Sequence, residues 1–128
     1  MRPHTLSEAY ERIVSGEPRE KALSEFLDTF YGLEPGERRA ALADAPLSTG
    51  DVRLDALAGA IAEYLSKQDG LRPPPWSLAP SRYLGKPWFT TDLPGAEIKA
   101  FLWHCSPAEF RSRNIFTEAQ PLRRAAQG

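Results

Sequence analysis

The sequence predicts an all-α domain of about six helices in a small orthogonal arrangement. Apolar residues recur at helical spacing through most of the chain, no segment of useful length alternates as a half-buried strand does, and glycine or proline separates successive helical segments. The 128 residues, 41% hydrophobic and 26% charged, have the length and composition of one globular domain. We therefore expect a single domain over residues 1–128.

The first two predicted helices are marked by their ends. Thr5 followed by Glu8 forms a capping-box sequence, and apolar residues of one helical face continue from there. Pro18 suits the first turn of a second helix, whose apolar pairs recur every four residues. Gly32 closes this helix, and a left-handed glycine there would turn Leu33 back toward the helix.

Two further helices complete an acidic part over residues 1–70. The third spans 35–43 and stops before Pro46, because the residue preceding a proline avoids the helical region. Gly59 lowers the helix propensity of the fourth, which favours a close crossing by another helix at that point. The fourth helix spans about 51–68 and has one apolar face, formed by Leu54, Leu57, Ala58, Ile61 and Leu65.

Residues 71–95 form a segment of different character. Six prolines stand among Trp76, Trp88 and Phe89, so polyproline and turn conformations are expected, with a short helical turn near 81–84. A disordered linker would be polar and poor in aromatic rings, which indicates an ordered arm lying across the helices. The rings either complete the core or anchor a protein partner, and the sequence leaves both interpretations open.

Helical periodicity returns in a basic part over residues 96–128. One helix is expected to end at Cys105. Ser106, Pro107 and Glu109 then supply an N-cap, a first-turn proline and a capping-box acid for a short helix. A last helical segment is expected from residue 121 onward.

The short helix is expected to end at Asn114, which tolerates the left-handed conformation. Ile115 would then pack on Phe110. Arg111 and Arg113 are predicted to lie on the exposed side of this helix, where they could contact a partner.

The formal charge is unevenly distributed although it totals only −1. Residues 1–70 hold 8 Lys and Arg against 13 Asp and Glu, a net of −5. Residues 71–128 hold 8 against 4, a net of +4. This asymmetry fits attraction between the two halves and equally fits steering of a charged partner.

No catalytic, cofactor or metal motif stands out. His104 and Cys105 are adjacent, so on a helix their side chains point about a third of a turn apart and cannot form a thiol–imidazole pair. One cysteine beside one histidine falls short of the four ligands of a structural zinc site, and the glycines lack phosphate-loop spacing. We therefore expect no enzyme activity and no bound cofactor or metal.

The expected compartment is a reducing cytoplasm. Cys105 is the only cysteine, so no internal disulfide can form. No run approaches the ~18 apolar residues that a membrane span requires, and the N-terminus leads into a charged helix. Neither secretion nor membrane insertion is expected.

Nucleic-acid binding is the alternative function. Basic residues that neutralise phosphate and rings that stack on bases share the C-terminal half. The pI of 6.1 lies far below the value of ~9 typical of such domains. The second and third helices would form a helix-turn-helix with only Arg38 and Arg39 as a basic pair. The C-terminal residues concerned are Arg72, Arg82, Lys86, Arg111, Arg113, Arg123, Arg124, Trp76, Tyr83, Trp88 and Trp103.

Two stretches resemble a pattern in small bacterial proteins: residues 83–89 (YLGKPWF) and 106–116 (SPAEFRSRNIF). Those proteins look like antitoxin-type partners encoded beside nucleotidyltransferase-like toxins. The resemblance implies a protein that acts by binding another protein and not by catalysis. Many antitoxins also carry a DNA-binding part, and no clear one is visible in this sequence.

We therefore expect a cytoplasmic, all-helical bacterial interaction module whose C-terminal half engages a protein partner. The expected partner is a toxin-like enzyme, for which the resemblance implies a nucleotidyltransferase-like form. Neutralising this enzyme is the expected function. The contact residues are predicted to be Trp88, Phe89, Trp103, Arg111, Arg113 and Asn114.

Overall fold

The computed structural model describes residues 3–91, 95–118 and 121–122. Within these ranges the chain forms six α-helices, two 3₁₀ helices and two very short strands, so the predicted all-α class is confirmed. The helical segment expected from residue 121 onward lies almost entirely outside the described residues. The elements are α1 (Leu6–Val14), α2 (Arg19–Phe30), α3 (Pro35–Ala43), α4 (Val52–Gln68), η1 (Pro75–Leu78), η2 (Pro80–Arg82), β1 (Trp88–Phe89), α5 (Ala96–Cys105), α6 (Ala108–Arg111) and β2 (Ile115–Phe116).

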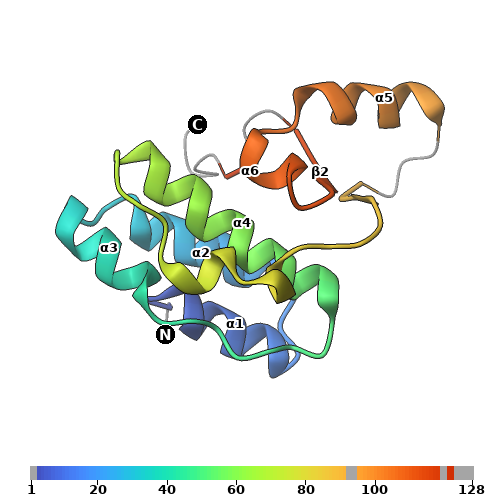
Figure 1. Ribbon diagram of the computed structural model, residues 1–128. Helices are drawn as coiled ribbons and strands as arrows, with labels where there is room; N and C mark the ends of the chain where they lie inside the picture. The colour runs from blue at the N-terminus through green and yellow to red at the C-terminus, as the bar shows by residue number, and fades with distance from the viewer. Residues whose placement is uncertain (1–2, 92–94, 119–120, 123–128) are drawn as a thin grey trace.

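Helix α4 forms the centre of the fold (Figure 1). All its residues from 56 to 62 are buried, and most of them are alanine or glycine. Small side chains let neighbouring elements approach the α4 backbone closely. Helices α1, α2 and α3 gather on one side of α4, while η1, η2 and α6 contact it elsewhere. The shared core includes Phe26, Phe30, Leu42, Ile61, Leu65 and Phe110.

The capping box predicted at Thr5 is confirmed, and α4 ends at a left-handed glycine. The Thr5 hydroxyl accepts from the Glu8 N–H at 3.0 Å, and the Glu8 carboxylate accepts from the Thr5 N–H at 3.1 Å. Gly70 has a φ of 70°, and the following N–H, of Leu71, donates to Ser66 at 2.9 Å. Each terminus thus satisfies backbone groups that a helix leaves unpaired.

The left-handed ending predicted at Gly32 is wrong, since the φ of this glycine is not positive. The last turn of α2 tightens instead, with the Gly32 N–H donating to the Thr29 carbonyl at 3.1 Å. The Arg38 guanidinium then donates to the carbonyls of Tyr31 and Leu33, both at 3.0 Å. The N–H groups of residues 31–33 thus satisfy carbonyls of the last turn, and the helix ends without a left-handed residue.

The proline-rich arm crosses α4 at Gly59. A Cβ atom placed on Gly59 would lie 2.8 Å from the Arg82 Cβ and 2.9 Å from the Ser77 carbonyl oxygen. The predicted close approach is therefore confirmed, but the crossing element is the arm and not another helix. Two 3₁₀ turns replace the single turn expected near residues 81–84.

A parallel bridge joins the end of the arm to the C-terminal part. Trp88 pairs with Ile115, and Phe89 pairs with Phe116. The Trp88 N–H donates to the Asn114 carbonyl at 2.8 Å. This pairing of residues far apart in sequence fixes the arm against the turn that follows α6.

The capping box predicted at Ser106 is wrong. The Ser106 hydroxyl accepts from the Thr117 N–H at 2.8 Å and lies 2.9 Å from the Thr117 carbonyl oxygen. The N-cap of α6 is Pro107, and Glu109 lies 3.7 Å from the Lys67 ammonium. The Ser106 hydroxyl does not cap α6 because it binds the backbone of Thr117, which follows β2.

Candidate protein-interaction surface

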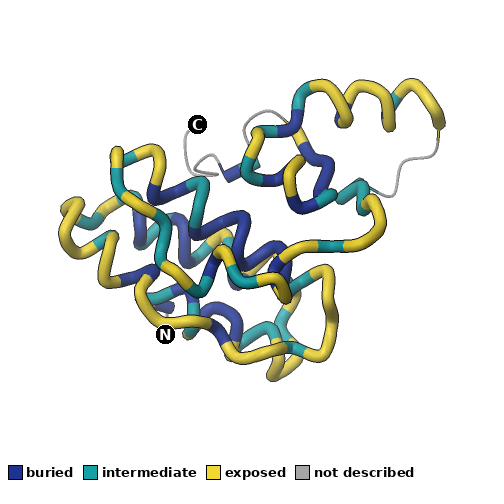
Figure 2. Tube along the Cα trace, in the orientation of Figure 1, coloured by how far each residue is buried: buried dark blue, intermediate teal, exposed yellow. Residues whose placement is uncertain are grey.

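Helix α5 is the most exposed helix of the described chain, as the yellow tube in Figure 2 shows. Its Phe101 is 64% exposed and its Trp103 is 48% exposed, while Leu102 between them is buried. None of the described helices is both long enough and apolar enough to cross a membrane. We call Ile98, Phe101 and Trp103 the α5 surface.

Two of the predicted contact residues meet on the buried ring of Phe116. The Trp103 ring stacks on it with a centroid distance of 4.5 Å and an interplanar angle of 7°. The Phe89 ring stacks on it at 5.1 Å and 26°. This stack fixes the base of α5 while about half of Trp103 still faces solvent.

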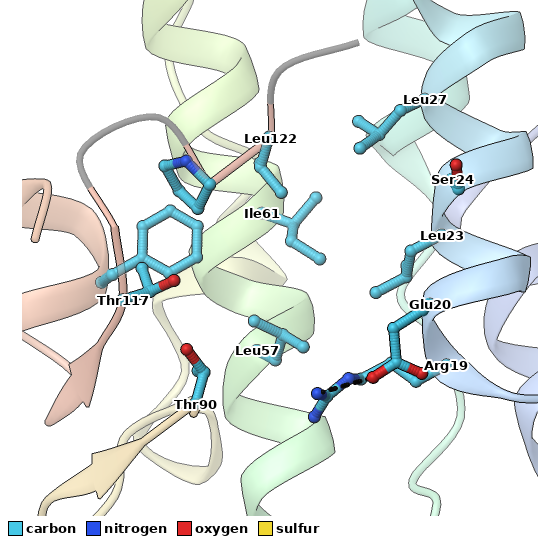
Figure 3. A pocket seen from close by; sticks show the side chains of 12 residues that line it. Arg19, Glu20, Leu23, Ser24, Leu27, Leu57, Ile61, Thr90, Thr117 and Leu122 are labelled. Atoms are coloured by element: carbon cyan, nitrogen blue, oxygen red, sulfur yellow. Dashed lines mark hydrogen bonds and ion pairs between the residues drawn. The ribbon is translucent and has the colours of Figure 1, made fainter. Parts of the chain in front are cut away.

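Three adjoining hollows meet at Thr90, and α5 lines only the third. The first, of about 400 Å³, lies between α2 and α4, with Leu57 and Ile61 facing the leucines of α2 (Figure 3). The second, of about 380 Å³, shares Arg19 with the first. The third, of about 340 Å³, reaches Phe101. Thr90 lines all three, so we call the combined depression the Thr90 groove.

Trp88 lies at one end of the Thr90 groove and is partly buried against the core. The guanidinium carbons of Arg19 and Arg53 lie 5.4 and 5.7 Å from its ring centroid, which are cation–π distances. Glu20 lines the same end, and its own backbone N–H together with Arg19 lowers the pKa of its carboxyl below the usual range. This end of the groove is therefore charged, whereas the part near α5 is largely apolar.

Arg111 and Asn114 lie near the end of α6. Arg111 is exposed, as predicted, and its Nη2 donates to the Ser106 carbonyl at 2.8 Å. Asn114 has the predicted left-handed backbone, with a φ of 64°. Its side-chain Nδ2 donates to the Leu84 carbonyl at 2.8 Å, which leaves its amide engaged within the fold.

The predicted exposure of Arg113 is wrong, because this side chain is completely buried. Its Nη1 donates to the Glu63 carboxylate at 2.6 Å, and its Nη2 donates to the Ser77 carbonyl at 2.7 Å. The guanidinium also lies over the Tyr83 ring, 4.5 Å from the centroid. Only its Nε lacks a hydrogen-bond partner within the described residues. Arg113 therefore connects elements inside the fold.

Arg82 is also buried, so it does not belong to a basic surface that could bind nucleic acid. Its guanidinium donates to the carbonyls of Pro46 and Asp55 at 2.9 and 3.2 Å and lies 4.9 Å from the Trp76 ring centroid. Arg38, one of the two basic residues of the possible helix-turn-helix, pairs with Asp69 at 3.1 Å. Arg38, Arg82 and Arg113 therefore serve the fold, so the nucleic-acid interpretation loses three of its cations.

The thiol and imidazole of α5 are not arranged as a catalytic pair. The Cys105 Sγ donates to the Thr117 carbonyl at 3.5 Å, and His104 is exposed. Within the described ranges, no group of three or more His, Cys, Asp and Glu side chains is placed to hold a metal ion.

Comparison with known proteins adds nothing to these observations: no protein-family model, curated protein or solved structure matches the chain. The functional interpretation therefore depends on the chemistry of the surface.

The sequence analysis missed Phe101 as a surface residue and Arg19 and Arg53 as neighbours of Trp88. One signal was available for α5. Its consecutive apolar residues at 101, 102 and 103 span about 200° around a helix, which is wider than one packed face. Arg19 and Arg53 carried no such signal, because only the tertiary fold brings them to Trp88.

Proposed function

We propose that this protein is a non-catalytic interaction module that binds a protein partner through the α5 surface and the Thr90 groove. The observation that carries the proposal is the exposure of Phe101 on α5, where its side chain lines a largely apolar hollow. Large exposed apolar side chains beside a groove are typical of interaction sites. Covering half of a ring of ~200 Å² contributes about 2.5 kcal/mol to binding.

The proposed partner is a toxin enzyme that this protein neutralises in the cytoplasm. The proposal draws on the resemblance of residues 83–89 and 106–116 to antitoxin-type proteins. Helix α5 lies between these two stretches in the sequence, and Phe89 and Phe116, one from each stretch, form the stack that supports Trp103. A partner that covers α5 would thus lie beside the two stretches that carry the resemblance.

Co-expression with the protein encoded by the adjacent gene tests this function. The two purified proteins should leave a size-exclusion column as one complex at micromolar concentration. Elution in two separate peaks at that concentration would contradict the proposal.

A further inference from the structure

The Trp88 end of the Thr90 groove holds two cations on one ring. Arg19 comes from the first turn of α2 and Arg53 from the first turn of α4, yet both guanidinium groups lie within 5.7 Å of the Trp88 ring centroid. Two like charges gathered on one ring repel each other. Glu20 already pairs with Arg19, so a further anion beside the ring would chiefly accept the N–H donors of Arg53.

Of the two arginines on Trp88, Arg53 has the guanidinium that can donate hydrogen bonds to a ligand. Arg19 Nη2 lies 3.1 Å from the Glu20 carboxylate. The Asp51 carboxylate accepts from the Arg53 backbone N–H at 2.9 Å and caps α4, where the helix dipole favours a negative charge. Among the described residues, the Arg53 guanidinium contacts Trp88 and has no ion pair or hydrogen bond.

We propose that this end of the groove binds a carboxylate of the protein partner, an Asp or Glu side chain next to apolar residues; the inference rests on the proposed function. A planar carboxylate fits the donor fork of Arg53. A phosphate would bring a second negative charge toward Glu20 and Asp51, which line the same hollow. A single negative charge therefore suits the site better.

The remainder of the groove indicates which residues of the partner would lie next to its Asp or Glu. Beyond Arg19 its apolar lining includes Leu23, Leu27, Leu57 and Ile61, with Ser24 and Thr117 as polar neighbours, and its far end reaches Phe101. Apolar side chains of the partner would lose exposed surface there. The fitting ligand is a segment with an acidic residue at one end and apolar residues along the rest.

A random peptide library displayed on phage, selected on the full-length protein, supplies the probe. Selected sequences should combine an acidic residue with apolar residues. Binding of the synthetic peptide should shift the Trp88 indole N–H signal in NMR spectra. The Trp76 indole N–H, bound to the Leu42 carbonyl at 3.0 Å in the core, serves as the internal reference. Recovery of basic peptides, or of none that shifts Trp88, would overturn the proposal.

Substitution on both sides identifies the contact. Arg53→Gln should weaken peptide binding by about tenfold, as should Glu→Gln in the peptide, and the two changes together should weaken it little more than either alone. Arg39→Gln is the matched control, because Arg39 is exposed on α3 outside the groove. Equal binding by the Arg53→Gln protein, or tighter binding of a peptide with phosphoserine in place of the acid, would overturn the carboxylate assignment.

The same variants separate this inference from the proposed function. If the partner complex survives Arg53→Gln but is lost with Phe101→Ser, the carboxylate site is wrong and the interaction function stands. If no partner complex forms while the selected peptide still binds beside Arg53, the proposed partner is wrong and the carboxylate site stands.

Discussion

Glu63 and Arg113, fifty residues apart in sequence, form a hydrogen-bonded ion pair of 2.6 Å in which the arginine side chain is completely buried. The same Nη1 donates to the Glu109 carbonyl at 2.7 Å, and Nη2 donates to the Ser77 carbonyl at 2.7 Å. One guanidinium therefore connects α4, the arm and α6. This guanidinium also positions the short segment between α6 and β2. Through β2 it helps to position Phe116, on which Trp103 of α5 stacks.

Arg113→Met should lower the free energy of unfolding by about 3–5 kcal/mol. The substitution removes one partner of a buried ion pair and leaves the carbonyls of Ser77 and Glu109 without their donor. Urea denaturation followed by circular dichroism measures the change. Arg39→Met removes an exposed arginine of α3 and should change stability by less than about 0.5 kcal/mol. Equal effects of the two substitutions would contradict the structural role of Arg113.

Gly59→Ala should destabilise the protein although alanine is the better helix former by about 1 kcal/mol. The new methyl group would lie 2.8 Å from the Arg82 Cβ and 3.1 Å from the Arg113 Nε, so the arm must shift. Gly36→Ala in α3 meets no atom within 4 Å and should be neutral or slightly stabilising. Thermal unfolding of the two variants makes the comparison, and a higher Tm for Gly59→Ala would show that the arm does not cross there.

Stability should fall as the pH drops below about 4.5, the ordinary pKa of a glutamate. Burial raises the pKa of Glu63, but hydrogen bonds from Arg113 and Lys67 outweigh it, so the net pKa is lowered. The folded state then binds fewer protons than the unfolded state in this range, and stability rises with pH. Glu63→Gln should flatten the profile of unfolding free energy below about pH 4.5. An unchanged slope would contradict the assignment.

Phe110→Ala and Phe101→Ala should differ sharply in stability. Phe110 is 1% exposed and packs edge-on against Tyr64, with ring centroids 5.7 Å apart. Its removal should cost about 3–5 kcal/mol. Phe101 is 64% exposed, so its removal should change the free energy of unfolding by less than about 0.5 kcal/mol. A large loss for Phe101→Ala would mean that α5 is buried in solution.

Local chemistry explains which parts of this fold could be predicted from the sequence. The helix starting at Leu6, the bounds of α3 and the left-handed Asn114 follow from residues within a few positions of one another. Gly59 also indicated a close crossing, because a glycine inside a helix needs a packing reason.

The features that could not be predicted depend on contacts between distant segments. Arg113 is buried because Glu63, the Ser77 carbonyl and the Tyr83 ring surround it, and none of these is close in sequence. The residues around Ser106 fit an N-cap, yet its hydroxyl forms hydrogen bonds with the backbone of Thr117. Tertiary contacts thus determine the positions of the Arg113 and Ser106 side chains, and these positions differ from the ones that local sequence favours.

The most direct test of the interaction surface is the affinity of the purified partner for two matched variants, measured by isothermal titration calorimetry. Phe101→Ser alters the α5 surface, and Leu47→Ser alters an 80% exposed leucine outside the α5 surface and the Thr90 groove. Phe101→Ser should weaken binding by at least about tenfold, while Leu47→Ser should bind like the unaltered protein. Equal affinity of Phe101→Ser and the unaltered protein would contradict a binding surface on α5.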